Sequence, residues 1–178
     1  APEYTHATVL DWQKVPKVLE GSWPWPLPSY RLLTEGEFAS GAFDEWMAGA
    51  NVAPYILCDT EYVPAKPSTD SVLRLIGLGY PGMKWIYQQE WVQTTEPSWT
   101  RARMIHAVKA LAKVKPFVFF NALADLAVLQ SSFGMTMDDF VGGIHDPMLA
   151  HAVLWSDFPH DFRFVASCYG RYPTVKHL

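Results

Sequence analysis

Apolar and polar positions alternate along the chain with two different periods, which divide it into strands and helices. A short apolar run from Tyr30 predicts a strand, and residues 35–47 then follow a helical period. Three further apolar runs have the length of strands, at residues 55–59, 72–79 and 84–88. Pro81 and Gly82 favour a tight turn between the last two runs, so we expect these three strands to form an antiparallel meander.

Helices alternate with strands in the second half. A helix is predicted from about Ser98 to Lys113, because Met104, Ile105, Val108 and Leu111 form an apolar stripe at helical spacing. Residues 117–120 predict a strand of the parallel type that turns directly into a helix.

Two more helices complete the pattern. One is predicted from Thr136, and the other is opened by Asp146 with Pro147 at its first position. The order of elements predicts an α/β fold, in which a mixed sheet of three antiparallel strands and then parallel-type strands is flanked by helices.

Residues 1–29 differ from the rest of the chain. They end in Gly-Ser-Trp-Pro-Trp-Pro-Leu-Pro, a run that excludes a regular helix or an interior strand. We expect an irregular arm at residues 1–29 and one domain at residues 30–178. The arm packs on the domain or against a partner, and recognition in the polyproline style is the alternative.

Composition narrows the class of protein. With 178 residues, 49% of them hydrophobic and 18% charged, the chain can bury a sizeable core. No apolar run approaches the ~20 residues of a membrane span, and the N-terminus lacks the features of a signal peptide. We therefore expect a cytoplasmic protein with no membrane partner. The net charge of −4 argues against a broad DNA-binding surface, although a site that holds only a strand end can rely on metals and stacking aromatics.

Two short patterns carry candidate chemistry. Asp59 and Glu61 follow an apolar run, and residues two apart in a strand share a face, so both carboxylates point together. Such a pair suits Mg²⁺ or Mn²⁺, while the alternative is a strand that ends in a solvated acidic turn. Asn121 lies at an expected helix N-cap with Asp125 one turn later on the same face. A capped helix with a solvated aspartate is the alternative there.

Together these patterns resemble the 3′-5′ exonuclease (proofreading) domain of family A, phage-type DNA polymerases, within the ribonuclease H-like DEDD exonucleases. That family has Asp-x-Glu after an apolar strand, here Asp59 and Glu61, and Asn-x-x-x-Asp at a strand-to-helix junction, here Asn121 and Asp125. The segment from Ile144 to Ser167 is similar to the family's next loop and helix. The resemblance runs from about Tyr30 to the C-terminus.

The resemblance implies a ribonuclease H-like fold and hydrolysis of DNA from the 3′ end of a single strand with two Mg²⁺ or Mn²⁺ ions. It makes Asp59, Glu61 and Asp125 the catalytic residues and metal ligands. It places Thr60, Tyr62 and Asn121 at the substrate. Asp146 supports the site and is not a ligand, since its position as a helix N-cap explains it fully. A phage or bacterial host and an attached or associated DNA polymerase are implied as well.

The sequence departs from the family in two places. Ala124 stands where the family usually has a bulky aromatic residue. The family's third motif, Tyr or His followed by Asp four residues later, is missing, so we expect a domain shortened at its C-terminus and weak activity. Another chain that completes the fold would supply the motif. Two other functions stay open, a non-catalytic nucleic-acid or polymerase-binding module and a structural interaction protein built around the arm.

Overall fold

The structure is a computed structural model that describes residues 20, 29–32, 40–63, 72–81, 85–90 and 99–169. The chain divides into two compact units. One is Pro28–His145, and the other includes Asp146–Leu178. The arm predicted at residues 1–29 lies almost entirely outside the described residues.

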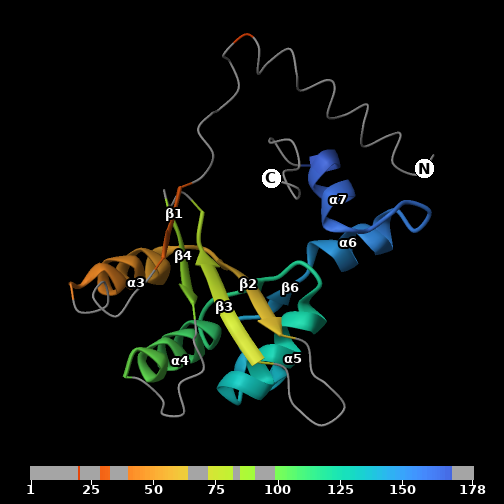
Figure 1. Ribbon diagram of the computed structural model, residues 1–178. Helices are drawn as coiled ribbons and strands as arrows, with labels where there is room; N and C mark the ends of the chain where they lie inside the picture. The colour runs from red at the N-terminus through yellow and green to blue at the C-terminus, as the bar shows by residue number, and fades with distance from the viewer. Residues whose placement is uncertain are drawn as a thin grey trace. The chain divides into compact units, whose positions relative to one another are not determined.

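A sheet with the strand order β1-β4-β3-β2-β5-β6 forms the centre of the first unit (Figure 1). Its strands are β1 (Ser29–Leu32), β2 (Ile56–Val63), β3 (Val72–Gly79), β4 (Trp85–Glu90), β5 (Phe117–Val118) and β6 (Ile144–His145). Strand β3 pairs with β2 on one side and with β4 on the other, both antiparallel, which confirms the predicted meander. Strand β5 pairs with β2 in parallel and β6 with β5 in parallel, so the sheet is mixed as expected.

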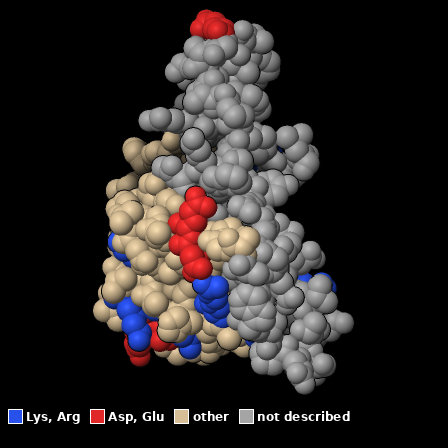
Figure 2. All heavy atoms as spheres, turned by 90° about the vertical axis from the view of Figure 1, so that its left-hand side faces the viewer, with Lys and Arg blue, Asp and Glu red and all other residues tan. Residues whose placement is uncertain are grey.

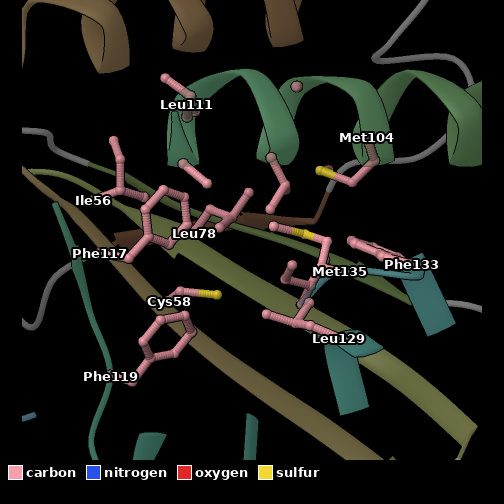
Figure 3. Packing of buried hydrophobic residues seen from close by; sticks show 14 of the residues in the cluster. Ile56, Cys58, Leu78, Met104, Leu111, Phe117, Phe119, Leu129, Phe133 and Met135 are labelled. Atoms are coloured by element: carbon pink, nitrogen blue, oxygen red, sulfur yellow. The ribbon is translucent and has the colours of Figure 1, made fainter. Parts of the chain in front are cut away.

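Three helices of this unit share one core with the sheet. They are α3 (Ala42–Val52), α4 (Trp99–Ala112) and α5 (Ala122–Phe133). Strands β2, β3 and β5 contribute Ile56, Leu78 and Phe117 to the same cluster, and the helices contribute Trp46, Leu111 and Leu129. Figure 3 shows side chains from α4 and from α5 meeting over β2 and β3. The helices therefore cover the sheet face onto which these strand residues point.

Burial alternates along β2 with the period of a strand. Ile56, Cys58 and Thr60 are buried, whereas Leu57, Asp59 and Glu61 are exposed. Because successive side chains of a strand point to opposite faces, the first group faces the helices and the second faces away from them. The prediction that Asp59 and Glu61 share a face of β2 is confirmed.

Several predicted boundaries were wrong. Helix α3 begins at Ala42 and runs past Met47 to Val52, because Gly41 adopts a φ of 84° that no helix can include. The residues before position 40 that were assigned to this helix lie outside the described residues. Strand β2 continues to Val63, so Asp59 and Glu61 lie within the strand and not at its end.

Two elements are shorter than predicted. Strand β5 spans Phe117–Val118 and not residues 117–120. The helix predicted from Thr136 is a single 3₁₀ turn, η2 (Met137–Asp139), closed by reciprocal hydrogen bonds between Thr136 and Asp139. These bonds satisfy the turn locally, and no longer helix follows.

The described part of the second unit contains α6 (Pro147–Leu154) and α7 (Phe162–Tyr169). Asp146 caps α6 as predicted, with Pro147 at the first helical position. The buried imidazole of His151 contacts the rings of His160, Phe164 and Tyr169. Among the described residues, no helix has both the length and the apolar character needed to cross a membrane.

Candidate functional site

The edge of β2 that faces β5 is only partly paired with another strand. Ile56 pairs with Phe117 and Leu57 with Val118, and β5 ends there. The chain then turns at Asn121 into α5, which contacts β2 and β3. Backbone groups of β2 beyond Leu57 on this side therefore need partners other than β5.

Asp125 supplies one of these partners from the first turn of α5. Its Oδ1 accepts a hydrogen bond of 2.8 Å from the backbone N–H of Thr60. The Thr60 hydroxyl donates a second hydrogen bond of 2.6 Å to the same oxygen. Both residues are buried, with 4% of Asp125 and 7% of Thr60 exposed. A carboxylate thus replaces the missing strand at this point of the sheet.

Asn121 makes the turn between β5 and α5 possible. Its φ of 68° and ψ of 58° are left-handed, and among the described non-glycine residues only this one has a positive φ. Asparagine tolerates this conformation better than most residues because its short polar side chain stabilises it locally. The residue is the N-cap of α5 as predicted, but its side chain makes no capping hydrogen bond, and it is exposed.

The environment of Asp125 raises the pKa of its carboxyl from 3.8 to about 6. Burial is the main cause, because it disfavours the charged form. The negative charge of Asp59 acts in the same direction, while the hydrogen bonds from Thr60 oppose it. Asp59 also helps to raise the pKa of the Cys58 thiol, after burial and Asp125. The charges of Asp59 and Asp125 are therefore close enough to interact.

Glu61 and Tyr62 flank an irregularity in β2. The pairing with β3 shifts register between them, which marks a bulge. Glu61 is exposed on the face of Asp59, and Tyr62 is half-buried against the core cluster. The strand predicted from the sequence ended at residue 59, whereas β2 includes both Glu61 and Tyr62 and carries a bulge between them.

Asp146 belongs to the second unit. Its carboxylate accepts hydrogen bonds from the backbone N–H groups of Met148, at 2.9 Å, and Leu149, at 3.4 Å. These bonds satisfy donors at the start of α6, as expected for an N-cap. Its structural role is thereby accounted for in full.

Cys58 lies near this site on the face of β2 that points into the core. Figure 3 shows its side chain in the core cluster beside Phe117 and Phe119. The thiol is buried and its pKa is raised well above the ordinary value. The contact between Thr60 and Asp125 was missed. It could have been suspected because Thr60 is a polar residue at a position of β2 where the alternation predicts burial.

Charge is mixed on the side of the molecule shown in Figure 2. Acidic and basic side chains of the described residues adjoin one another there, and no broad basic surface is seen among them. Arg103 of α4 pairs with Asp44 of α3 in this way. The described residues on this side therefore do not form the broad basic surface that proteins use to bind long stretches of duplex DNA.

The donor atoms at the edge of β2 suit a hard divalent cation. Asp59 and Asp125 offer carboxylate oxygens whose charges repel one another, a cost that a cation would relieve. The described residues contain no group of three or more His, Cys, Asp or Glu side chains placed to hold a metal. Mg²⁺ commonly uses one or two carboxylates and completes its shell with water and substrate phosphates. The residues fit that mode and do not form a closed protein cage.

No protein-family model matches the sequence, and a search of curated proteins gives no match. Solved structures do match it. Escherichia coli RNase D, an exoribonuclease involved in structured RNA processing, aligns with a TM-score of 0.58 and 19% identity over 83% of this chain and 35% of its own.

Two structures from Trypanosoma brucei align similarly. RNase D in complex with U12 RNA has a TM-score of 0.61 and 14% identity over 93% of this chain and 52% of its own. The catalytic core of RRP6 has a TM-score of 0.58 and 17% identity over 85% of this chain and 38% of its own. The chain thus spans between 35% and 52% of the length of these structures. It shares the ribonuclease H-like fold with these structures.

Proposed function

We propose that this protein is a metal-dependent 3′-5′ exonuclease that removes nucleotides from the 3′ end of a single strand. The observation that carries the proposal is the buried carboxylate of Asp125, held at the edge of β2 with the charge of Asp59 beside it. A buried carboxylate with a second negative charge beside it is costly to ionise unless a cation shares the site. The resemblance of Asp59, Glu61, Asn121 and Asp125 to the exonuclease motifs supports the proposal from the sequence.

Each residue has a role in this proposal. Asp59, Glu61 and Asp125 would hold two Mg²⁺ or Mn²⁺ ions. When bound, these ions would activate a water molecule and stabilise the leaving 3′ oxygen. Glu61 orients the nucleophile or the terminal hydroxyl. The exposed amide of Asn121 donates to the end of the strand, and Tyr62 lies beside the terminal nucleotide.

The finer part of the proposal concerns the substrate. The resemblance to polymerase domains favours DNA, a proofreading role, an attached or associated polymerase and a phage or bacterial cytoplasm. Within that proposal the exonuclease-like domain is residues 30–178 and the arm is residues 1–29. Among the solved structures with the same fold, Escherichia coli RNase D is an exoribonuclease, and Trypanosoma brucei RNase D holds U12 RNA. RNA is therefore tested beside DNA.

A second function is favoured by one observation. The described residues contain no group of three metal-ligating side chains. A non-catalytic module that binds nucleic-acid strand ends or a polymerase, without turning over, would have the same fold and an incomplete metal site. Its binding would not require a metal.

The experiment is degradation of 5′-labelled single-stranded oligonucleotides, DNA and RNA of one sequence, in Mn²⁺. A ladder that shortens from the 3′ end is expected for the wild type. Asp125→Asn lowers the rate by about 100-fold or more, because a ligand worth several kcal/mol in the transition state is lost. Asp138→Asn, which removes an exposed carboxylate from η2, leaves the rate unchanged.

Chelation and binding separate the two functions. The exonuclease stops in excess chelator and resumes when Mn²⁺ is restored. Intact oligonucleotides in every condition, together with binding that survives both chelator and Asp125→Asn, would refute the exonuclease and establish the binding module. Comparison of the DNA and RNA ladders decides the substrate.

A further inference from the structure

We propose that Thr60 is a positioning residue, whose two hydrogen bonds orient the Asp125 carboxylate for the metal-dependent reaction. Its catalytic consequence rests on the proposed exonuclease function. The positioning itself rests on the contacts between β2 and α5. The resemblance assigned Thr60 to the substrate, so this role is a different one.

Thr60 holds the Asp125 carboxylate by two hydrogen bonds. The backbone N–H and the hydroxyl of Thr60 reach the same oxygen of Asp125, at 2.8 and 2.6 Å. A single bond would let the carboxylate swing about its acceptor atom, whereas two donors from one residue restrict that motion. Hydrogen bonds to a charged acceptor are also stronger than neutral ones. The orientation of Asp125 is therefore set by a residue 65 positions earlier in the chain.

Burial explains why a hydroxyl is needed at this position. Residue 60 lies on the face of β2 that also carries Ile56 and Cys58, where an apolar side chain would be the ordinary choice. A buried hydroxyl without a partner is unfavourable, and here the Thr60 hydroxyl donates a hydrogen bond to Asp125. The two residues therefore depend on each other, since Thr60 requires an acceptor and Asp125 requires donors.

The same burial argues against direct contact between the Thr60 side chain and a nucleotide. Only 7% of the residue is exposed, and its hydroxyl is 2.6 Å from Asp125. Its neighbours Asp59 and Glu61 are the exposed residues of this stretch. Any effect of the Thr60 hydroxyl on the reaction must therefore pass through Asp125.

The test compares Thr60→Val with Thr60→Ser in the full chain. Valine keeps the shape and the backbone donor but removes the hydroxyl, and serine keeps the hydroxyl. We expect Thr60→Val to weaken Mn²⁺ binding by about tenfold or more, as is usual when a group that orients a metal ligand is lost. The Mn²⁺ affinity of Thr60→Ser should stay within about threefold of the wild type, because serine keeps the hydroxyl that orients Asp125. In the oligonucleotide assay Thr60→Val lowers kcat and leaves KM unchanged.

A stability control and a direct readout complete the test. Val108→Ala truncates a buried side chain of α4 and lowers stability without altering the Thr60–Asp125 contact. It should leave Mn²⁺ binding unchanged. Carboxyl-carbon NMR reads the pKa of Asp125 without any turnover. That pKa rises further in Thr60→Val and not in Thr60→Ser, because the hydroxyl bond opposes the upward shift.

The outcomes are distinguishable. Equal Mn²⁺ affinities and equal Asp125 pKa values in Thr60→Val and Thr60→Ser would overturn the positioning role. An equal loss of Mn²⁺ binding in Val108→Ala would overturn it too, because the effect would then be one of general stability. If the wild type leaves both oligonucleotides intact, the exonuclease proposal fails, and the NMR and Mn²⁺ measurements still decide whether Thr60 positions Asp125.

Discussion

The charge of Asp59 acts on Asp125 although the two side chains are placed differently. Asp59 is exposed on the face of β2 that also carries Leu57 and Glu61, and Asp125 is buried at the edge of the same strand. Their repulsion adds to the effect of burial and raises the pKa of Asp125 to about 6. Ionisation of Asp125 therefore lowers the stability of the metal-free folded protein.

Stability should fall as the pH rises through the pKa of Asp125. The pKa is higher in the folded protein, about 6, than its ordinary value of 3.8. The folded state then binds the proton more tightly, so its contribution to stability is complete below about pH 4 and is lost above about pH 6. The upper limit of the loss is about 3 kcal/mol.

Asp125→Asn tests this dependence. The amide keeps an oxygen that can accept from Thr60 and carries no charge, so the variant should be more stable than the wild type at pH 7.5 and equally stable near pH 4. Urea denaturation between pH 4 and 8 measures both proteins. A wild type that gains stability relative to the variant as the pH rises would contradict the prediction.

Mn²⁺ should raise the melting temperature of the wild type and have less effect on Asp59→Asn. A ligand at a hundredfold excess over its Kd stabilises a protein by about 2.7 kcal/mol, or about 5 °C or more for a domain of this size. Differential scanning calorimetry with and without Mn²⁺ measures the shift. Asp138→Asn is the matched control, and an equal shift in Asp59→Asn would place the ion elsewhere.

Substitutions of Asn121 should separate its backbone role from the role of its amide. Asn121→Ala should cost about 1 kcal/mol, because alanine is strained at a φ of 68°. Asn121→Gly should keep the stability of the wild type, since glycine adopts this conformation freely. In the proposed exonuclease both variants lose the amide and bind the strand end more weakly. Full activity in Asn121→Gly would leave the residue with a structural role only.

A side chain at position 142 should destabilise the protein, because a Cβ there would collide with the backbone of Lys115. We expect Gly142→Ala to cost about 1–3 kcal/mol through overpacking. Gly134→Ala is the control, since Gly134 has a φ of +61° and nothing within 4 Å of an added Cβ. Its cost of about 1–2 kcal/mol comes from the backbone alone. A milder effect at Gly142 than at Gly134 in urea denaturation would contradict this account.

Cys58 should be inert in the folded protein. The reactive species of a cysteine is its thiolate, and burial together with the charges of Asp125 and Asp59 raises the pKa of this thiol. Iodoacetamide at pH 8 should modify the half-buried Cys168 faster than Cys58, and urea should remove the difference. Mass spectrometry of the peptides measures both rates. Equal rates without urea would mean that the sheet opens at β2.

Local rules predicted the parts of the fold that local interactions determine. Strand β3 spans Val72–Gly79 as predicted, because its apolar run is bounded by turn residues on both sides. Asp146 caps α6 as predicted, since the bonds that define an N-cap involve only the next three residues. The shared face of Asp59 and Glu61 followed from the alternation of β2 in the same way.

Long-range contacts determined what the sequence could not reveal. The alternation along β2 indicates which face each side chain occupies, but not which element meets the edge of the strand. Asp125 was expected beside Asp59 and Glu61, and the contact that the structure shows is with Thr60. The length of β5 depends on where α5 packs, and no local signal at residues 117–120 reports that.

The hydrogen bond between the Thr60 N–H and Asp125 has a consequence for self-association. An unpaired N–H at a strand edge invites a strand of another molecule to add there, which is a common start of aggregation. Here a buried carboxylate occupies the donor, and its negative charge opposes an incoming strand. Replacing Asp125 by an apolar residue would leave this N–H without its partner, so we expect the side chain proposed for catalysis to oppose aggregation as well.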